Sequence, residues 1–448
     1  MSSTDLILER RFAKIDPFNP LSVPQVKAYI AHRKWPMPLH RTERDENGER
    51  KPTTNDESLL ELLREGKPAF GDKVLDGVLD ARHLSKARSY LSEKYVHPDG
   101  RLHPIFTMKP KQRLSSAAPN VMNFPKGKKG EILKEASAAL LSSIEADPGY
   151  TLFSADWNSL HPALIAHFAG DANYARIARL GDHAFVMSHF LAMEGRLPAP
   201  VDLDRPDSVV KAELDALKER FPADYKVCKV ANLAYKYLQG VFNMARTTGL
   251  TVDKTKKLRA AIDAASPKVA AWRRTVLDTA HFQGRLVSPF SLPLTFFDVY
   301  KRGPNGKVEL DKEGEPKLGA EAPEASSFFP LATESGMLRE VLVMLFEDPR
   351  CELRYKPFTA LEDTGKQGSF VMLIPEHDKI IGQARDSEVE GLLRELIVPT
   401  MNRPWPELDG LRVGVDVEIG KRLMECGSTC AWKAAPVCEA GHMKGFKL

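Results

Sequence analysis

The sequence predicts an α+β fold, in which many helices accompany a few well-separated strands. In Phe153 to Asp171, FSADWNSLHPALIAHFAGD, a short apolar run ends on Asp156 and a helical pattern begins almost at once. In FVMLIPEHDKIIGQA, two apolar runs flank a tight polar turn at Asp378, which is typical of a β-hairpin. Between these stretches the pattern from Asn173 to Leu250 is mainly helical.

The composition indicates a folded globular protein. The chain has 448 residues, of which 43% are apolar and 28% charged, so it can form two to four domain-sized units or one large enzyme. The 64 basic residues barely exceed the 60 acidic ones, and net charge therefore does not indicate a nucleic-acid binder. The start, MSSTDLILERRFAK, lacks a signal-peptide core, and no run of about 18 apolar residues occurs. We expect a cytoplasmic protein that does not contact a membrane.

Cysteine usage does not suggest a disulfide framework, because five cysteines are few for this length. Cys426, Cys430, Cys438 and His442 gather in the tail. Their irregular spacing does not match the usual paired zinc ligands, so we do not expect a metal there.

Residues 1–98 read as a small helical subdomain. PLSVPQVKAYIAHRKWPMP predicts a helix with Ser22 as its cap and Pro24 at an early position. The polar stretch from Arg41 to Asp56 predicts an exposed loop, and ESLLELLREG and DARHLSKARSYLSEKY predict two more helices.

The stretch from Arg101 to Lys129 contains no acidic residue, and its basic residues alternate with Ser and Asn. Such a segment can follow a phosphate backbone, because cations displace counterions and short polar side chains fix the register. A solvated basic loop is the alternative on charge alone.

Three further patterns each allow a structural and a functional interpretation. Asp156 or Asn158 could cap the following helix, or Asp156 and Asp378 together could hold metal ions through carboxylate oxygens. The helix from Tyr225 to Arg246 could be an ordinary amphipathic helix with solvated lysines. The Asp378 turn could be a charged hairpin tip.

A resemblance favours the functional interpretations. DGRLHPIFTMKPKQRLSSAAPNVMNFP resembles a segment of the family A DNA polymerases, the bacterial DNA polymerase I class, which reads TGRLSS-PN-QN-P. In the family this segment contacts the primer-template duplex, and Lys111 and Gln112 replace its Thr-Gly here. The matching residues are Arg113, Leu114, Ser115, Ser116, Pro119, Asn120, Asn123 and Pro125.

The stretch from Phe153 to Asp171 resembles the family's motif A. Trp157 replaces its Tyr, His161 its Glu and Ala163 its Arg. The family's Glu walls off the sugar 2′ position, so His161 leaves the choice of sugar open. The residues that keep the register are Asp156, Ala166, His167, Phe168 and Asp171.

The helix from Tyr225 to Arg246 resembles the family's motif B, whose Lys contacts the triphosphate and helps protonate the leaving pyrophosphate. Lys229, Asn232, Tyr237, Phe242, Ala245 and Arg246 fit one register. Tyr225 stands at the family's Arg position with Lys226 beside it, Leu233 replaces an aromatic residue and Leu238 a Gly. Loss of the aromatic surface predicts weaker nucleotide binding. His183 resembles a family histidine near the triphosphate, although a core or surface histidine is the alternative.

Motif C of the family reads VHDE. His377 and Asp378 are retained, whereas Glu376 replaces Val and Lys379 replaces Glu. LATES stands where the family has a QGT element, so its DNA contact is expected to be lost, and LRVGVDVEIG resembles the terminal strand.

The resemblance implies a right-hand polymerase fold with an antiparallel-sheet palm, a helical thumb and helical fingers. Residues 1–98 would hold the N-terminal segment and thumb, 99–172 the first part of the palm, 173–325 the fingers and following loop, and 326–448 the second part of the palm and the tail. Because few residues precede the first match, we expect no proofreading exonuclease in this chain.

The implied function is template-directed addition of dNTPs to a primer 3′ end, in a bacterial or phage-infected cell, with a separate exonuclease or processivity partner conceivable. Two Mg²⁺ ions would be held by Asp156, Asp378 and the Trp157 carbonyl. A weakened polymerase that only binds DNA, and an enzyme with altered sugar or template choice, stay open. The implied nucleotide-binding residues are Trp157, His161, His183, Tyr225, Lys226, Lys229, Leu233 and Tyr237, and the DNA-binding residues are Arg113, Ser115, Asn120, Asn123 and His377.

Overall fold

The computed structural model describes residues 18–44, 49–64, 66–90, 95–109, 113–123, 138–236, 238–311, 314–352, 368–425 and 441–446. The chain divides into two compact units. The first contains Met1–Ile105, Ser116–Glu145 and Arg422–Met424, and the second contains Phe106–Ser115, Ala146–Lys421 and Glu425–Leu448. The boundary passes through the hairpin of β3 (Ile105–Met108) and β4 (Leu114–Ala117), and again through β11 (Arg422–Glu425).

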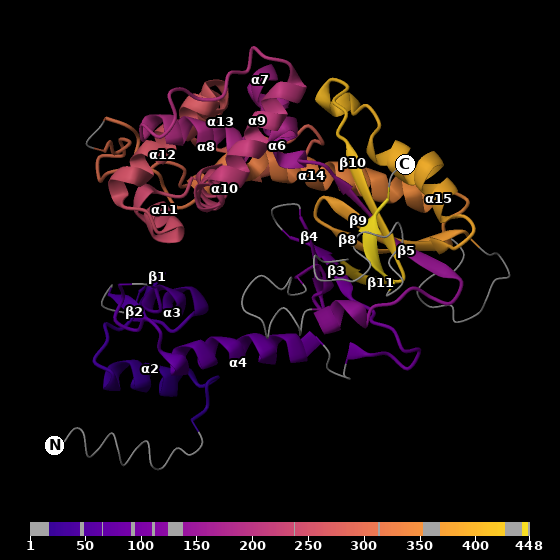
Figure 1. The fold of residues 1–448 in the computed structure, drawn as a ribbon, viewed down its shortest axis with the longest axis horizontal. Helices are drawn as coiled ribbons and strands as arrows, with labels where there is room; N and C mark the ends of the chain where they lie inside the picture. The colour runs from indigo at the N-terminus through magenta and orange to yellow at the C-terminus, as the bar shows by residue number, and fades with distance from the viewer. Residues whose placement is uncertain are drawn as a thin grey trace. The chain divides into compact units, whose positions relative to one another are not determined.

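The first unit has a helical core, as predicted, formed by α2 (Val23–His32), α3 (Asp56–Leu62) and α4 (Lys73–Tyr90) (Figure 1). Ser22 takes the N-cap position of α2, but its side chain makes no capping hydrogen bond. The unit also contains the short η2 (Val121–Asn123).

The loop expected from Arg41 to Asp56 was wrong, because β1 (Leu39–Arg44) and β2 (Arg50–Pro52) pair there as an antiparallel hairpin. The exposed side chains of β2 explain the polar sequence: the backbone pairing holds these strands together, and neither needs an apolar face.

The second unit is built on an antiparallel sheet with the order β12-β10-β5-β9-β8, which confirms the α+β class. The strand β5 (Tyr150–Trp157) lies in the middle, between β10 (Val415–Gly420) and β9 (Lys379–Arg385). β12 (His442–Gly445) pairs with β10, and β8 (Phe370–Glu376) pairs with β9 at one edge of the sheet. β8 and β9 form the predicted hairpin, with His377 and Asp378 as its turn.

Helices cover one face of this sheet and bury its apolar residues (Figure 1). They are α6 (Leu160–Ala169), α14 (Ala322–Glu347) and the run of α15 (Val389–Leu392), η4 (Leu393–Ile397) and α16 (Val398–Met401), followed by η5 (Pro406–Leu408). Phe153, Ala155 and Trp157 point into this core. Since side chains alternate along a strand, Asp156 lies on the opposite face.

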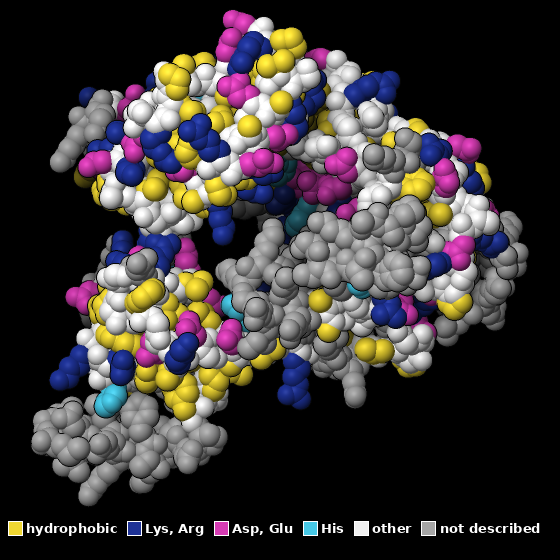
Figure 2. Space-filling model, viewed as in Figure 1, with side chains coloured by type: hydrophobic (Ala, Val, Ile, Leu, Met, Phe, Trp, Pro, Cys, Tyr) yellow, Lys and Arg dark blue, Asp and Glu magenta, His cyan; other side chains and the backbone are white. Residues whose placement is uncertain are grey.

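The helical patterning from Asn173 to Leu250 is confirmed. It comprises α7 (Ala172–Leu180), α8 (Asp182–Met193), α9 (Asp207–Arg220), α10 (Pro222–Lys236) and α11 (Val241–Thr248). With α12 (Val252–Ala265), these helices share a second core that is separate from the core beneath the sheet. On the face shown in Figure 2, Lys and Arg are interspersed with Asp and Glu, as the balanced composition predicts.

The single helix expected from Tyr225 to Arg246 was wrong. It is broken between α10 and α11, because Leu238 adopts a left-handed conformation (φ 54°) and Gly240 starts a new helix. Lys229 and Asn232 therefore lie on α10, whereas Arg246 lies on α11.

After α13 (Pro267–Gln283), β6 (Arg285–Val287) pairs with β7 (Pro293–Thr295). The following polar stretch forms paired turns, with bridges such as Arg302 to Val308. α14 begins at Ala322 and carries Glu334 near its middle. Within the described residues, no helix has the length and apolarity needed to cross a membrane.

Candidate active site

Asp156 lies on the sheet rather than at a helix cap. β5 ends at Trp157, and the N-cap position of α6 is Ser159, which has φ 52° and makes no side-chain capping bond. The capping interpretation of Asp156 and Asn158 was therefore wrong. The carboxylate of Asp156 stands near the end of the central strand, on the face opposite the packed core.

Asp378 lies beside this strand end. The turn that carries it begins with His377 at φ 58°, and Glu376 pairs with Lys379 across the hairpin. The Trp157 amide donates a 3.1 Å hydrogen bond to the Asp378 carbonyl, and Asp156 is paired in register with Lys379. The main chain thus brings the two predicted aspartates to adjacent positions.

Asp416 is a third carboxylate that sequence reasoning missed. It is the cross-strand partner of Asp156 on β10 and is exposed. Residues directly opposite on antiparallel strands have Cβ atoms about 4.5–5.5 Å apart and share one face. The alternation in VDVEIG identified the strand, but only the pairing of β10 with β5 reveals this neighbour.

The donor atoms of Asp156 and Asp378 fit a hard divalent cation, since Mg²⁺ prefers oxygen ligands. Lys379 brings a positive charge to the same face, where the family has an acid, but its ammonium lies 3.2 Å from the buried carboxylate of Glu376. That ion pair offsets part of the positive charge beside Asp156. Within the described ranges, the two aspartates and any third side chain do not form a set of ligand atoms all within 4.8 Å.

A cavity of about 330 Å³ lies beside Asp378. His161 from α6, His183 from α8 and the exposed Lys229 from α10 line it, so these predicted residues are brought together from three helices. Arg273 of α13 also lines it and was missed, because its position in SPKVAAWRRTVLDT carries no sequence signal of a site. Its guanidinium stacks on the Tyr235 ring, 4.2 Å from the centroid, which holds it in place.

The imidazole of His183 has a fixed orientation. The buried Asn232 lies 3.0 Å from His183 Nδ1, and its Nδ2 donates to Asp182 at 3.1 Å. The Tyr225 ring stands edge-on to His183 at 6.4 Å, and burial raises the pKa of Tyr225. Asn232 and Tyr225 therefore hold His183 at the cavity wall. Tyr237 and the side chain of Leu233 lie outside the described residues, and Lys226 is exposed.

A second network, which we call the Glu334 triad, consists of Glu334, His161 and Arg113. Arg113 Nη2 donates to both oxygens of Glu334 at 2.9 Å, and His161 Nε2 hydrogen-bonds to Glu334 Oε2. The Glu334 side chain is only 2% exposed. Burial raises the pKa of Glu334, but the hydrogen bond and charge of His161 and the charge of Arg113 outweigh burial, so the pKa lies below the ordinary value of 4.5.

The predicted DNA contacts fall in both units. In the second unit, His377 Nδ1 is buried and has no hydrogen-bond partner among the described residues, and burial and the Arg113 charge lower the pKa of His377. Ser115 lies on β4. In the first unit, Asn123 Nδ2 donates to Asn120 Oδ1 at 3.1 Å. Lys111, Gln112 and Pro125 lie outside the described residues.

Two further predictions concern Trp157 and the tail. The indole of Trp157 is 2% exposed and donates to the Met401 carbonyl at 2.9 Å, so a nucleotide-binding role for this side chain is wrong because it faces the core. Its backbone carbonyl stays a candidate ligand. Cys426, Cys430 and Cys438 lie outside the described residues, and His442 begins β12.

Comparisons with known proteins find relatives named DNA polymerase I. Thermostable DNA polymerase I from Thermus filiformis is 24% identical over 412 residues, which cover 90% of this chain and 41% of that protein. DNA polymerase I from Deinococcus radiodurans is 36% identical over 120 residues, which are 25% of this chain and 11% of that protein. No protein-family model matches the chain. The chain spans about two-fifths of the length of the first of these relatives.

Among solved structures, the POL domain of Pol1 from M. smegmatis, in complex with DNA primer-template and dNTP, has a TM-score of 0.64 at 18% identity. The match covers 90% of this chain and 61% of that one. The sheet and its helices therefore have the fold of a polymerase domain. Over most of its length, the chain is similar in sequence to proteins named DNA polymerase I.

Proposed function

We propose that this chain is a DNA-directed DNA polymerase, which adds dNTPs to the 3′ end of a primer paired with a template. The observation that carries the proposal is the meeting of Asp156 and Asp378 beside a cavity lined by His161, His183 and Lys229. The relatives named DNA polymerase I, and a structural neighbour solved with primer-template and dNTP, support it.

In this proposal Asp156, Asp378 and the Trp157 carbonyl hold two Mg²⁺ ions. Bound Mg²⁺ would lower the pKa of the primer 3′ hydroxyl and offset charge on the attacking and leaving oxygens. The exposed ammonium of Lys229 binds the triphosphate and supports the leaving pyrophosphate. His183 donates a hydrogen bond to the triphosphate, with its ring held by Asn232. Such chemistry depends on positioning and charge.

Five described residues are proposed to contact primer-template DNA. Arg113, Ser115 and His377 are the proposed contacts in the second unit, and Asn120 and Asn123 those in the first. The orphaned nitrogen of His377 supports its part, because a buried polar atom is stabilised when a ligand supplies its hydrogen bond. The assignment of residues 1–98 to the thumb, 99–172 and 326–448 to the palm, and 173–325 to the fingers belongs to the same proposal.

Primer extension tests the proposal. Purified full-length chain is given a primer-template, Mg²⁺ and dNTPs, and Asp156→Asn is compared with Asp207→Asn, which alters an exposed ion pair with Arg176 in the same unit. We expect extension by wild type and by Asp207→Asn but none by Asp156→Asn. Absence of extension by wild type, or equal extension by Asp156→Asn, would overturn the proposal.

A first alternative is a polymerase-derived protein that binds DNA without synthesis. Lys379 favours it, because a cation is paired in register with Asp156 where the family has an acid. Tight primer-template binding without extension, restored by the double change Leu233→Phe and Lys379→Glu, would support this alternative.

A second alternative is a polymerase with a different choice of sugar or template. The Glu334 triad favours it, since His161 on the cavity wall is held by a buried carboxylate. Extension assays with ribonucleotides, and with an RNA template, separate this alternative from the main proposal.

A further inference from the structure

A tight turn in the first unit, residues 96–102, gathers metal-binding side chains. Val96 and Leu102 form an antiparallel bridge, the His97 amide donates to the Arg101 carbonyl at 2.9 Å, and the Gly100 amide donates to the His97 carbonyl at 2.8 Å. Gly100 has φ +79°, which suits glycine in such a turn. The backbone therefore fixes the spacing of the side chains that the turn carries.

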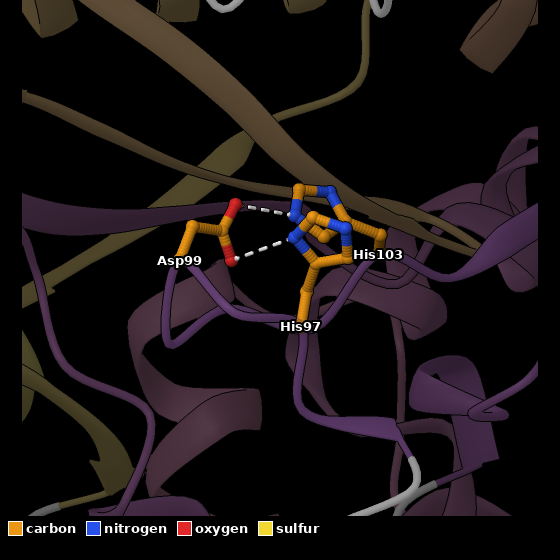
Figure 3. A group of neighbouring side chains, drawn as sticks. All are labelled: His97, Asp99 and His103. Atoms are coloured by element: carbon orange, nitrogen blue, oxygen red, sulfur yellow. Dashed lines mark hydrogen bonds and ion pairs between the residues drawn. The ribbon is translucent and has the colours of Figure 1, made fainter.

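His97, Asp99 and His103 converge on one side of this turn (Figure 3). The Asp99 carboxylate faces both rings from one side, with Oδ1 3.4 Å from His97 Nδ1 and Oδ2 2.8 Å from His103 Nε2. The ring centroids are 4.9 Å apart, and the three ligand atoms all lie within 4.8 Å of one another. We call this group the His-Asp-His cluster.

These separations suit a small divalent ion. Ligands at about 2.0–2.1 Å from a tetrahedral Zn²⁺ are about 3.3–3.4 Å from one another. The 3.4 Å separation of His97 Nδ1 from Asp99 Oδ1 matches this value, and the 2.8 Å separation of His103 Nε2 from Asp99 Oδ2 is shorter. Small side-chain rotations would therefore let all three residues bind one ion. The ring nitrogens that bind the ion must carry no proton, so ion binding would compete with protons.

The charge of the cluster also favours a cation. An aspartate carboxylate is ionised at neutral pH, so Asp99 supplies negative charge beside the two imidazoles. The Arg101 amide donates to Asp99 Oδ1 at 2.9 Å and orients the carboxylate. All three residues are exposed, so solvent ligands can complete the coordination.

We propose that the His-Asp-His cluster binds one divalent transition-metal ion, with Zn²⁺ as the best fit. Two imidazoles and one carboxylate select ions of the Zn²⁺, Co²⁺ and Ni²⁺ group, whereas Mg²⁺ and Ca²⁺ prefer oxygen ligands alone. This ion differs in kind from the Mg²⁺ proposed at Asp156 and Asp378. By joining His97 to His103, it stabilises the turn that immediately precedes β3.

The test is a Zn²⁺ titration of chelator-treated, full-length protein in a competition assay with a chromogenic chelator, without DNA or nucleotide. We expect the double variant His97→Ala/His103→Ala to bind one ion fewer than wild type, and each single variant to bind that ion at least about tenfold more weakly. His83→Gln is the matched control, because His83 pairs with Asp56 at 3.2 Å in the same unit but has no third ligand nearby among the described residues.

Co²⁺ substitution separates this site from the cysteines of the tail. Thiolate ligands give an intense near-ultraviolet charge-transfer band, whereas a cobalt ion on the His-Asp-His cluster gives none. Asp99→Asn serves as a second variant if the double variant does not fold, since it keeps the volume and removes the charge. The proposal would be overturned if wild type and a folded cluster variant bound Zn²⁺ with the same stoichiometry and affinity. It would also be overturned if Mg²⁺ displaced the bound Zn²⁺ as readily as Zn²⁺ itself does. The result does not depend on polymerase activity.

Discussion

The Glu334 triad allows a quantitative test of how the cavity wall is held. Glu334→Gln removes the negative charge but keeps the volume and one acceptor oxygen. Arg113 and His161 then lose the carboxylate that pairs them, while both remain partly hydrated because their side chains are 30% and 26% exposed. The substitution therefore separates the charge of Glu334 from its packing.

The expected loss of stability follows from burial. Removing one partner of a fully buried ion pair costs about 3–5 kcal/mol. Because Arg113 and His161 can rehydrate, and Gln still accepts one hydrogen bond, we expect the free energy of unfolding to fall by about 2 kcal/mol. The control is Glu340→Gln, on the same helix, which breaks the ion pair between Glu340 and Arg403. Because the Glu340 side chain is 39% exposed, this substitution should lower the free energy of unfolding by less than about 1 kcal/mol.

The effect on sugar choice is the functional readout. If the carboxylate of Glu334 positions His161, its loss frees the ring and lets a ribose 2′ hydroxyl enter. We expect the ratio of kcat/KM for dNTP over rNTP to fall about tenfold, or about 1.4 kcal/mol. Urea unfolding followed by tryptophan fluorescence, and single-nucleotide extension, measure the two effects.

The pH dependence gives a check with a definite sign. The pKa of Glu334 is lower in the folded protein than its ordinary value of 4.5, so the carboxylate stabilises the fold above that pH. This stability is lost as the pH falls below about 4.5, through the folded-state pKa. The stability difference between wild type and Glu334→Gln should shrink over that range. A constant difference, or an unchanged nucleotide ratio in a destabilised variant, would refute the positioning role.

Three further changes test the rest of the site. Asp378→Asn should lower kcat by at least about 10³-fold in primer extension, and a folded variant with near-normal kcat would contradict its role. Lys229→Ala should lower kcat/KM for dNTP by about 10²-fold. Lys226→Ala, which changes a nearby exposed lysine on the same helix, should have a smaller effect, and equal effects of the two substitutions would contradict the role proposed for Lys229. Lys379→Glu should lower the Mg²⁺ concentration needed for half-maximal extension, because it removes a cation paired with Asp156; an unchanged requirement would show that Glu376 already offsets that charge.

Local pattern was enough to predict the elements that carry the site. The apolar run before Asp156 and the two runs around Asp378 identified β5, β8 and β9, because period-two patterning and a tight turn are local signals. Helix ends were less predictable. The helix expected from Tyr225 to Arg246 continues in its hydrophobic pattern across Leu238, whose left-handed conformation depends on tertiary packing against another core.

Partners distant in sequence could not be predicted. In the sequence, Glu334 is part of LATES, which indicated only that a DNA contact of the family is lost. The hydrogen bonds of Glu334 to Arg113 and His161 are seen only in the folded structure. Asp416 could not be predicted for the same reason, since the sequence of a strand does not determine which strand it pairs with. The capping alternative for Asp156 was wrong because three residues, Trp157, Asn158 and Ser159, separate it from the start of the helix at Leu160.

The hydrogen bond from the Trp157 amide to the Asp378 carbonyl has a consequence for how this protein tolerates change. The spacing of the two aspartates is set by main-chain pairing, so volume-conserving substitutions on the buried face of β5 leave it intact. One inserted residue in β5 would instead turn Asp156 into the core and Trp157 towards solvent. The site can therefore survive extensive drift in its supporting side chains, but not a single insertion in this strand.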